Sequence, residues 1–195
     1  MRLLPLALLS LLPSCSLLRG ARTDPTRYFV LTTIDTKASA AIDTTIGVDH
    51  VELPEYLRRD EIVSRSASNQ IMIADYDRWG EPLRDGFART LRRDLESELG
   101  SGHVFGQPFE PSQLPALTLD VEVRHLEHMA GQGAALEAEW TLRERVKGTV
   151  LLVHATKLTV PAADKDPGAE IAALSKAVSK MSAEIAAAVR ERKQP

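Results

Sequence analysis

Three segments in which apolar and polar side chains alternate constrain the fold of this chain more than any other feature. In residues 117–124 and 136–143 every second side chain is apolar, and residues 149–160 are rich in β-branched side chains. Such patterns are typical of β-strands, and strict alternation indicates that one face is buried. Glycines at residues 131–133 and 147–148 predict short turns, so we expect an antiparallel meander that is covered on one face only.

Two amphipathic helices are the natural cover for that sheet. The first is expected to begin at Pro82, where a missing N–H costs nothing, and to end at Gly100. Its apolar stripe recurs every four residues and consists of Leu83, Phe87, Leu91, Leu95 and Leu99. The remaining side of this helix, which includes Asp94, is charged, and we interpret it as a solvated face.

The second helix is predicted over residues 167–192, with Asp166 as its cap and Pro167 in its first position. Its apolar side chains are spaced alternately by three and four residues, which gives a narrow seam. They are Ile171, Leu174, Val178, Met181, Ile185 and Ala188. We favour packing of this seam against the sheet, and a coiled-coil contact with a partner protein remains the alternative.

The first half of the folded region predicts shorter elements. The apolar and β-branched stretches indicate strands at 28–33, 44–53, 62–65 and 70–74, a turn at 54–57, a hairpin at 66–69 and a loop at 103–116. A change of phase at Asp49–His50 indicates a β-bulge. Together these elements predict one α/β (α+β) domain over residues 28–195, a mostly antiparallel twisted sheet with two long amphipathic helices packed on one face.

The chain begins with the plan of an export signal. Arg2 precedes an apolar run at residues 3–12, which is too short to span a bilayer. The run leads into Leu12-Pro13-Ser14-Cys15, which resembles the bacterial lipobox and contains the only cysteine of the chain. We therefore predict a lipoprotein signal peptide at 1–14, acylation of Cys15 and a tether at 15–27, the alternative being a plain signal peptide with an incidental cysteine.

Charge and motif content exclude several classes of function. The net charge of −3 argues against nucleic acid as a partner. The sequence has none of the common nucleophile, nucleotide-binding or zinc-protease motifs, so we expect neither an enzyme nor a cofactor. His125 and His128 lie three apart on a predicted strand and should point to opposite faces, which argues against a metal site.

A resemblance emerges from the ordered motifs between residues 51 and 99. They are Leu53-Pro54, Tyr56-Leu57, Ile62-Val63 before Arg65, Arg78-Trp79 and Glu81-Pro82-Leu83. This series, with the lipobox and the early strand, resembles the PqiC-type ABC transport auxiliary lipoproteins.

The resemblance implies a non-enzymatic subunit on the periplasmic face of the outer membrane, and Ser16 after the cysteine fits that sorting. It also implies docking to an MCE-domain (mammalian cell entry) tunnel protein of an inner-membrane transport complex. Assembly into a homo-oligomeric ring and phospholipid as cargo are further implications.

Five residues are candidates for a partner or oligomer interface: Tyr56, Leu57, Arg65, Trp79 and Pro82. The large side chains among them can instead fill the core, which we favour. Two other functions stay open: a structural or assembly lipoprotein that binds another envelope complex without lipid cargo, and an unrecognised periplasmic hydrolase.

Overall fold

The computed structural model describes residues 24–34, 42–130, 132–163 and 166–192. The predicted signal peptide, Cys15 and most of the predicted tether lie outside the described residues. None of the described helices is long and apolar enough to cross a membrane.

The described chain forms an eight-stranded mixed sheet and two long helices. The strands are β1 (Arg27–Phe29), β2 (Ile46–Glu52), β3 (Glu61–Ala67), β4 (Gln70–Trp79), β5 (Val104–Gly106), β6 (Leu117–Met129), β7 (Gly133–Glu144) and β8 (Val150–Val160). The helices are α1 (Leu83–Leu99) and α2 (Pro167–Glu191), with a 3-10 turn, η1, at Glu55–Leu57. The predicted fold class is therefore confirmed.

Strand β6 is the centre of the sheet. It pairs with β7 along its whole length, and β7 pairs with β8, so the predicted antiparallel meander is confirmed. On its other side β6 pairs in parallel with β2 and, at His128 and Met129, with β3. The register between β2 and β6 shifts between Val48 and His50, where the change of phase predicted a bulge.

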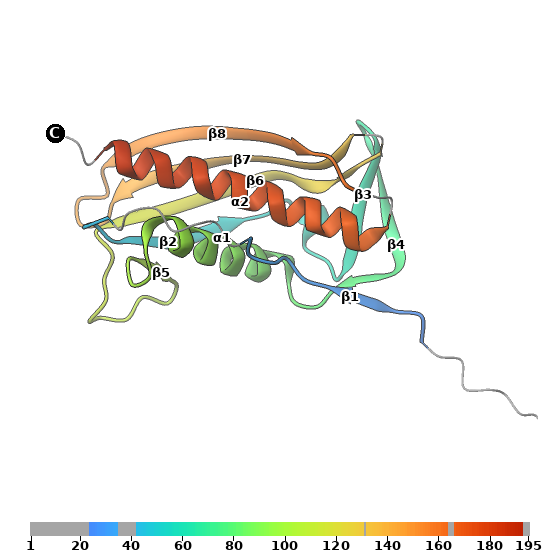
Figure 1. The fold of residues 1–195 in the computed structure, drawn as a ribbon, viewed down its shortest axis with the longest axis horizontal. Coiled ribbons are helices and arrows are strands. Elements are labelled where there is room, and N and C mark those ends of the chain that lie inside the picture. The colour runs from blue at the N-terminus through green and yellow to red at the C-terminus, as the bar shows by residue number, and fades with distance from the viewer. Residues whose placement is uncertain (1–23, 35–41, 131, 164–165, 193–195) are drawn as a thin grey trace, which may run out of the picture.

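Both helices pack on one face of the sheet and lie beside each other (Figure 1). The predicted stripe of α1 is buried, and four of its members, Phe87, Leu91, Leu95 and Leu99, are fully inaccessible. The seam of α2 is buried inside the domain from Ile171 to Ile185. Ala177 and Ser182 of α2 are fully buried as well, which shows that more of its surface is covered than the seam alone.

Residues 30–34 depart from the predicted strand. Only Arg27–Phe29 pairs with β4, and the chain then crosses the helical layer as a strap, our name for residues 30–34. The amide of Thr32 donates to Ser175 Oγ of α2 at 3.1 Å, and the amide of Ile34 donates to Asp94 Oδ1 of α1 at 3.3 Å. The strap leaves the sheet because helical side chains supply the partners of its backbone.

The strap also corrects the expectation for Asp94. This side chain was predicted on the solvated face of the first helix, but it is 2% exposed because the strap covers it. Arg89 Nη2, also of α1, donates to the carbonyl of Leu31 in the strap at 2.9 Å. The Leu31 side chain is itself buried in the core.

The expected loop at 103–116 contains the short strand β5, which pairs in parallel with β2. Phe109 and Pro115, from the same segment, lie so close to Gly47 of β2 that a Cβ there would meet them at 2.6 and 2.7 Å. Gly47 is therefore the residue that lets this segment pack over β2. Three strand residues are too few to show a period in the sequence.

We predict that Leu31→Ala lowers the free energy of unfolding by about 2–5 kcal/mol, because it removes a buried leucine from the strap and leaves a cavity. Urea denaturation followed by circular dichroism measures the change. The matched control is Val30→Ala at the neighbouring exposed position, which should cost about 0.5 kcal/mol or less. Equal effects of the two variants would contradict the packing of the strap.

Candidate functional site

The five predicted interface residues fall into three different environments. Leu57 and Trp79 are buried in the core, at 2% and 7% exposed. Pro82 is exposed at the start of α1. Tyr56 and Arg65, nine residues apart in the sequence, meet in a polar network with Glu127 of β6. A role of any of them in an interface stays a prediction.

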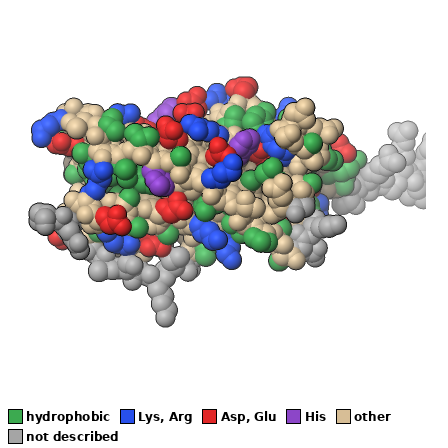
Figure 2. Space-filling model, turned by 90° about the horizontal axis from the view of Figure 1, so that it is seen from above, with side chains coloured by type: hydrophobic (Ala, Val, Ile, Leu, Met, Phe, Trp, Pro, Cys, Tyr) green, Lys and Arg blue, Asp and Glu red, His purple; other side chains and the backbone are tan. Residues whose placement is uncertain are grey.

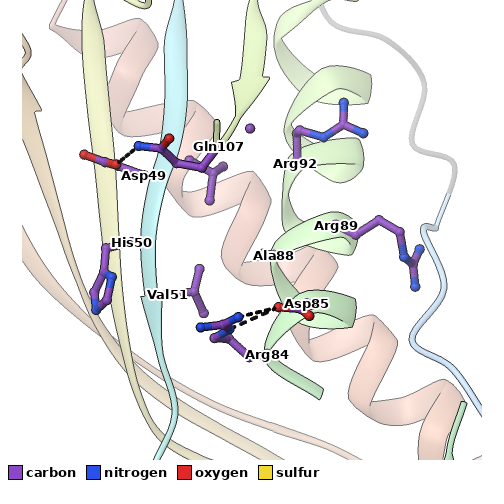
Figure 3. A pocket seen from close by; sticks show the side chains of 11 residues that line it. Asp49, His50, Val51, Arg84, Asp85, Ala88, Arg89, Arg92 and Gln107 are labelled. Atoms are coloured by element: carbon purple, nitrogen blue, oxygen red, sulfur yellow. Dashed lines mark hydrogen bonds and ion pairs between the residues drawn. The ribbon is translucent and has the colours of Figure 1, made fainter. Parts of the chain in front are cut away.

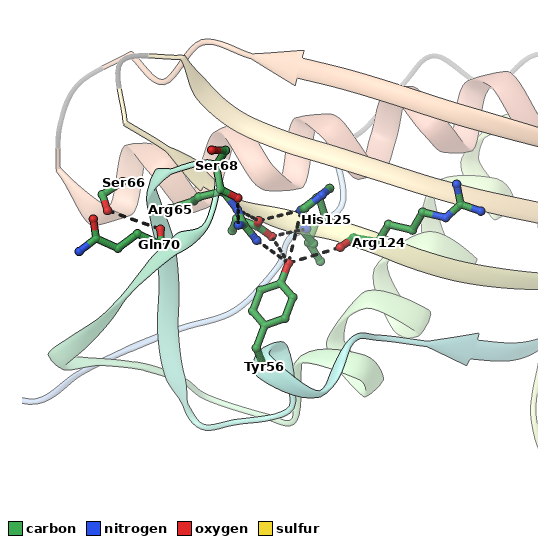
Figure 4. A network of polar contacts seen from close by, with 9 residues as sticks. Tyr56, Arg65, Ser66, Ser68, Gln70, Arg124 and His125 are labelled. Atoms are coloured by element: carbon green, nitrogen blue, oxygen red, sulfur yellow. Dashed lines mark hydrogen bonds and ion pairs between the residues drawn. The ribbon is translucent and has the colours of Figure 1, made fainter.

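The network is built around the carboxylate of Glu127, whose side chain has no exposed surface. Figure 4 shows Tyr56, Arg65 and His125 converging in this network. Arg65 Nε donates to Glu127 Oε1 at 2.7 Å, and His125 Nδ1 lies 2.9 Å from the same oxygen. Glu127 Oε2 accepts from the Tyr56 hydroxyl at 3.0 Å and from the backbone amide of Leu126 at 2.9 Å. Both carboxylate oxygens are therefore satisfied by groups of the same chain.

The pKa values of the network follow from burial and charge. Burial alone would raise the pKa of Glu127, but the hydrogen bonds from Arg65, His125, the Leu126 amide and Tyr56 hold it below its usual value. Burial, together with the neighbouring negative charge of Glu127, raises the pKa of Tyr56 to about 12. At neutral pH the network therefore contains an ionised Glu127 and a neutral Tyr56.

This arrangement holds separate segments of the chain together. The carboxylate is inaccessible, so it cannot reach a substrate, although a carboxylate beside a histidine could suggest acid–base chemistry. Arg65 instead extends the network to the β3–β4 turn, where its Nη1 donates to the carbonyl of Ser68 at 2.9 Å. Its backbone carbonyl accepts from the amide of Ala130 at 3.0 Å. The network thus fixes η1 and the β3–β4 hairpin to the end of β6.

The sequence also contained no signal for a hollow between β2 and α1, which are distant in the chain (Figure 3). This cavity of about 450 Å³ has Val48, Val51 and Ala88 in its walls, with Arg84 and Arg92 along α1. A second hollow, in which Pro82 lies, shares His50, Val51, Arg84 and Asp85 with the first.

The arginines of the first hollow are already paired within the chain. Arg84 contacts Asp85 at 3.0 Å, Arg92 contacts Glu96, and Arg89 turns away to Glu81 and the strap. The hollow has room for a small polar or amphipathic group. An anion would find no unpaired arginine in it, because all three arginines contact carboxylates of the same chain.

The two histidines of the H-x-x-H pair point to opposite faces of β6, as expected. His125 faces Glu127 and Tyr56, whereas His128 Nε2 lies 3.3 Å from Glu170 Oε1 of α2. Across the described ranges, no group of three or more His, Cys, Asp or Glu side chains could hold a metal ion.

Comparison with known proteins gives a family and a fold. A family model described as ABC-type transport auxiliary lipoprotein component matches residues 29–186. The crystal structure of a protein from Xanthomonas campestris has a TM-score of 0.73 at 17% identity, and the match covers 87% of this chain and all of that one. The structure of an uncharacterized protein has a TM-score of 0.68 at 22% identity, with 84% of this chain and 98% of that one covered.

More distant comparisons add little. The PelC dodecamer from Paraburkholderia phytofirmans has a TM-score of 0.45 at 14% identity, over 77% of this chain and 90% of that one. This likeness is too weak for its assembly to inform that of the present chain. No curated protein matches the sequence.

We predict that Glu127→Ala lowers the free energy of unfolding by about 3–5 kcal/mol, because Arg65 then keeps a largely buried charge without its carboxylate. The double variant Arg65→Met/Glu127→Leu should recover much of that loss, since it removes both charges and fills the space. Urea denaturation at neutral pH measures both. Glu122→Ala, at an exposed carboxylate on the same strand, is the control. A double variant no more stable than Glu127→Ala would contradict the importance of charge pairing.

We also predict a specific effect of acid. Because the pKa of Glu127 is lower in the folded than in the unfolded chain, its stabilising effect is present above the ordinary glutamate value of 4.5 and is lost as the pH falls through the folded value. The free energy of unfolding of Glu127→Gln should therefore fall less steeply below pH 4.5 than that of the unmodified protein. Glu61, whose pKa the Arg78 ion pair also lowers, leaves a residual slope in both. Identical slopes would contradict the prediction.

Proposed function

The chain belongs to the family of ABC-type transport auxiliary lipoprotein components, and on this premise we propose that it is a lipid-anchored docking subunit of an MCE-type phospholipid transport system of the bacterial envelope. The observation that carries the proposal is the extent of the family match. It runs from β1 to the last turns of α2 and so includes nearly the whole described domain. The family is one of transport components, generally without catalysis of their own.

The proposed anchor is Cys15. Removal of residues 1–14 as a signal peptide would make it the first residue of the mature protein, followed by a tether to residue 27 and a single domain at 28–195. Each buried methylene of an acyl chain contributes about 0.8 kcal/mol, so two or three chains hold a protein on a bilayer stably. Ser16 after the cysteine supports the periplasmic face of the outer membrane as its location.

The MCE partner and a PqiC-type role rest on the motif series between Leu53 and Leu83. The placement of that series is compatible with a rigid docking module. Leu57 and Trp79 pack in the core and support the segment from within, while Pro82 and the adjoining hollow lie at the surface. A partner surface of this kind needs a fixed backbone more than a reactive group.

We propose a homo-oligomer because the sheet has an open edge. Within the described part of the chain β8 pairs with β7 alone, so its outer edge keeps unpaired backbone groups along eleven residues. Figure 2 shows the molecule from the side on which β8 lies in Figure 1. On this surface hydrophobic side chains lie among charged ones. Val150 and Val153 of β8 are 47% and 52% exposed. A long edge strand of this kind is a ready template for pairing with another copy.

We predict that deletion of the gene sensitises the cell to detergent, and that the full-length protein restores resistance and co-purifies with an MCE-domain protein. Cys15→Ala should move the protein from the membrane to the soluble fraction, abolish incorporation of labelled fatty acid and fail to restore resistance. Ser14→Ala, which keeps a small residue before the cysteine, is the matched control and should behave like the unmodified protein.

The outcomes separate the parts of the proposal. Labelled fatty acid on the Cys15→Ala variant would refute the anchor. Normal detergent resistance of the deletion strain, together with no MCE partner, would refute the transport role and favour a structural envelope lipoprotein.

A further inference from the structure

Exposed apolar side chains gather at one end of the molecule. Of the ten large hydrophobic side chains exposed among the described residues, six lie in residues 28–30 and 71–76. We use the name end surface for five of them: Tyr28, Ile71, Met72, Ile73 and Tyr76, which are 68%, 36%, 57%, 47% and 56% exposed. Such clustering at one end calls for a function, whereas single exposed apolar residues do not.

The sheet explains why these side chains are uncovered. Strand β1 pairs with β4 only over residues 77–79, so residues 70–76 of β4 form an open edge of a projecting hairpin. Three consecutive apolar residues lie in that segment, and successive side chains of a strand point to opposite faces. Met72 is therefore exposed on one face, and Ile71 and Ile73 are exposed on the other. A hairpin surrounded only by water would carry polar side chains on at least one face.

The charges at this end are balanced within the chain. Arg27 of β1 contacts Asp77 at 2.7 Å, and Arg78 of β4 contacts Glu61 of β3 at 2.9 Å. The strands β1 and β4 themselves contain two arginines and two aspartates, Asp75 and Asp77, so these two strands carry no net charge. The end surface therefore fits an apolar or zwitterionic partner better than a strongly charged one.

The tether identifies that partner. In Figure 1, β1, the first described strand, lies at the end of the molecule that β4 also forms. Asp24 lies nine positions after Cys15, a reach of at most about 30 Å at full extension. An acylated Cys15 would thus keep this end of the domain near the bilayer, while the C-terminal end of α2 lies at the opposite end (Figure 1).

We propose that the end surface rests directly on the phospholipid bilayer that holds the lipid anchor. Tyr28 and Tyr76 lie at the level of the headgroups, where aromatic side chains with a polar tip are favoured. Ile71, Met72 and Ile73 enter the boundary between headgroups and acyl chains. This inference rests on the proposed anchoring through Cys15, to which it adds a second contact that sets the orientation of the domain.

The orientation follows from rigidity as well as from contact. The Arg65–Glu127 ion pair and the bond from Arg65 to Ser68 hold the hairpin against the end of β6. The hairpin therefore cannot turn independently of the sheet. A bilayer at the β4 end places the C-terminal end of α2 away from the membrane, on the side from which the proposed periplasm-spanning partner approaches.

The test uses the full-length lipidated protein in phosphatidylcholine vesicles with either brominated or ordinary acyl chains. Bromine quenches tryptophan on contact. The variant Tyr76→Trp places a reporter on the end surface, and Val153→Trp places one at a similarly exposed position on β8. The native Trp79 and Trp140 are both buried and give a background common to all variants. Co-sedimentation with vesicles is measured on the same samples.

We expect brominated lipid to reduce the emission of Tyr76→Trp relative to the unmodified protein and to leave that of Val153→Trp unchanged. Addition of salt should not restore the emission, because the contact is apolar. Co-sedimentation without quenching of Tyr76→Trp would overturn the bilayer contact while leaving the anchor intact, and would assign the end surface to a protein neighbour. Absence of co-sedimentation would overturn the anchor and the contact together.

Discussion

The buried carboxylate of Glu127 is the interaction on which one whole end of this molecule depends. Taking an ionised carboxylate out of water is costly unless charged and polar groups surround it. Glu127 receives them from three places: Tyr56 of η1, Arg65 of β3, and His125 with the Leu126 amide of β6 itself. Because η1 and β3 have to be in place to satisfy this one side chain, their positions are coupled to the central strand. The β3–β4 hairpin is held at the same end of the sheet through Arg65.

The helical layer is organised by a second polar constraint. Ser175 of α2 and Asp94 of α1 accept hydrogen bonds from the amides of the strap, and Arg89 donates to its carbonyl at Leu31. Buried polar side chains between helices are unfavourable without hydrogen-bond partners. The backbone of a strand that leaves its sheet also loses its hydrogen-bond partners. Each supplies what the other needs. The strap thereby ties both helices to β1 and to the end of the molecule at which β1 lies.

Periodic elements could be predicted from the sequence, whereas non-periodic ones could not. The α1 stripe, the α2 seam and the β6–β8 meander each repeat a physical pattern over many residues, and all are present. The cap at Asp166 has a local signal of its own, an aspartate directly before a proline, and it is present too. The strap is predicted as a strand because β-branched residues favour an extended chain, whether or not that chain pairs in a sheet. Strand β5 is too short to show any period. Asp94 was assigned to solvent because a helix pattern cannot reveal a segment sixty residues earlier that covers it. Long-range partners, and not local propensity, decided these cases.

The same limit applies to the candidate surfaces, because exposure also depends on long-range partners. Residues 70–74 are predicted as a strand and belong to β4, yet Ile71, Met72 and Ile73 are exposed because β1 pairs with β4 only at residues 77–79. Trp79 and Leu57 are core residues, the role that we favour for large side chains in this segment. Exposure depends on where pairing stops, which the sequence does not encode locally. In a lipid-anchored protein, apolar side chains that are exposed beside the tether lie close enough to the bilayer to contact lipid. The resulting contact would convert a flexible lipid attachment into a defined orientation, at no cost to the packing of the domain.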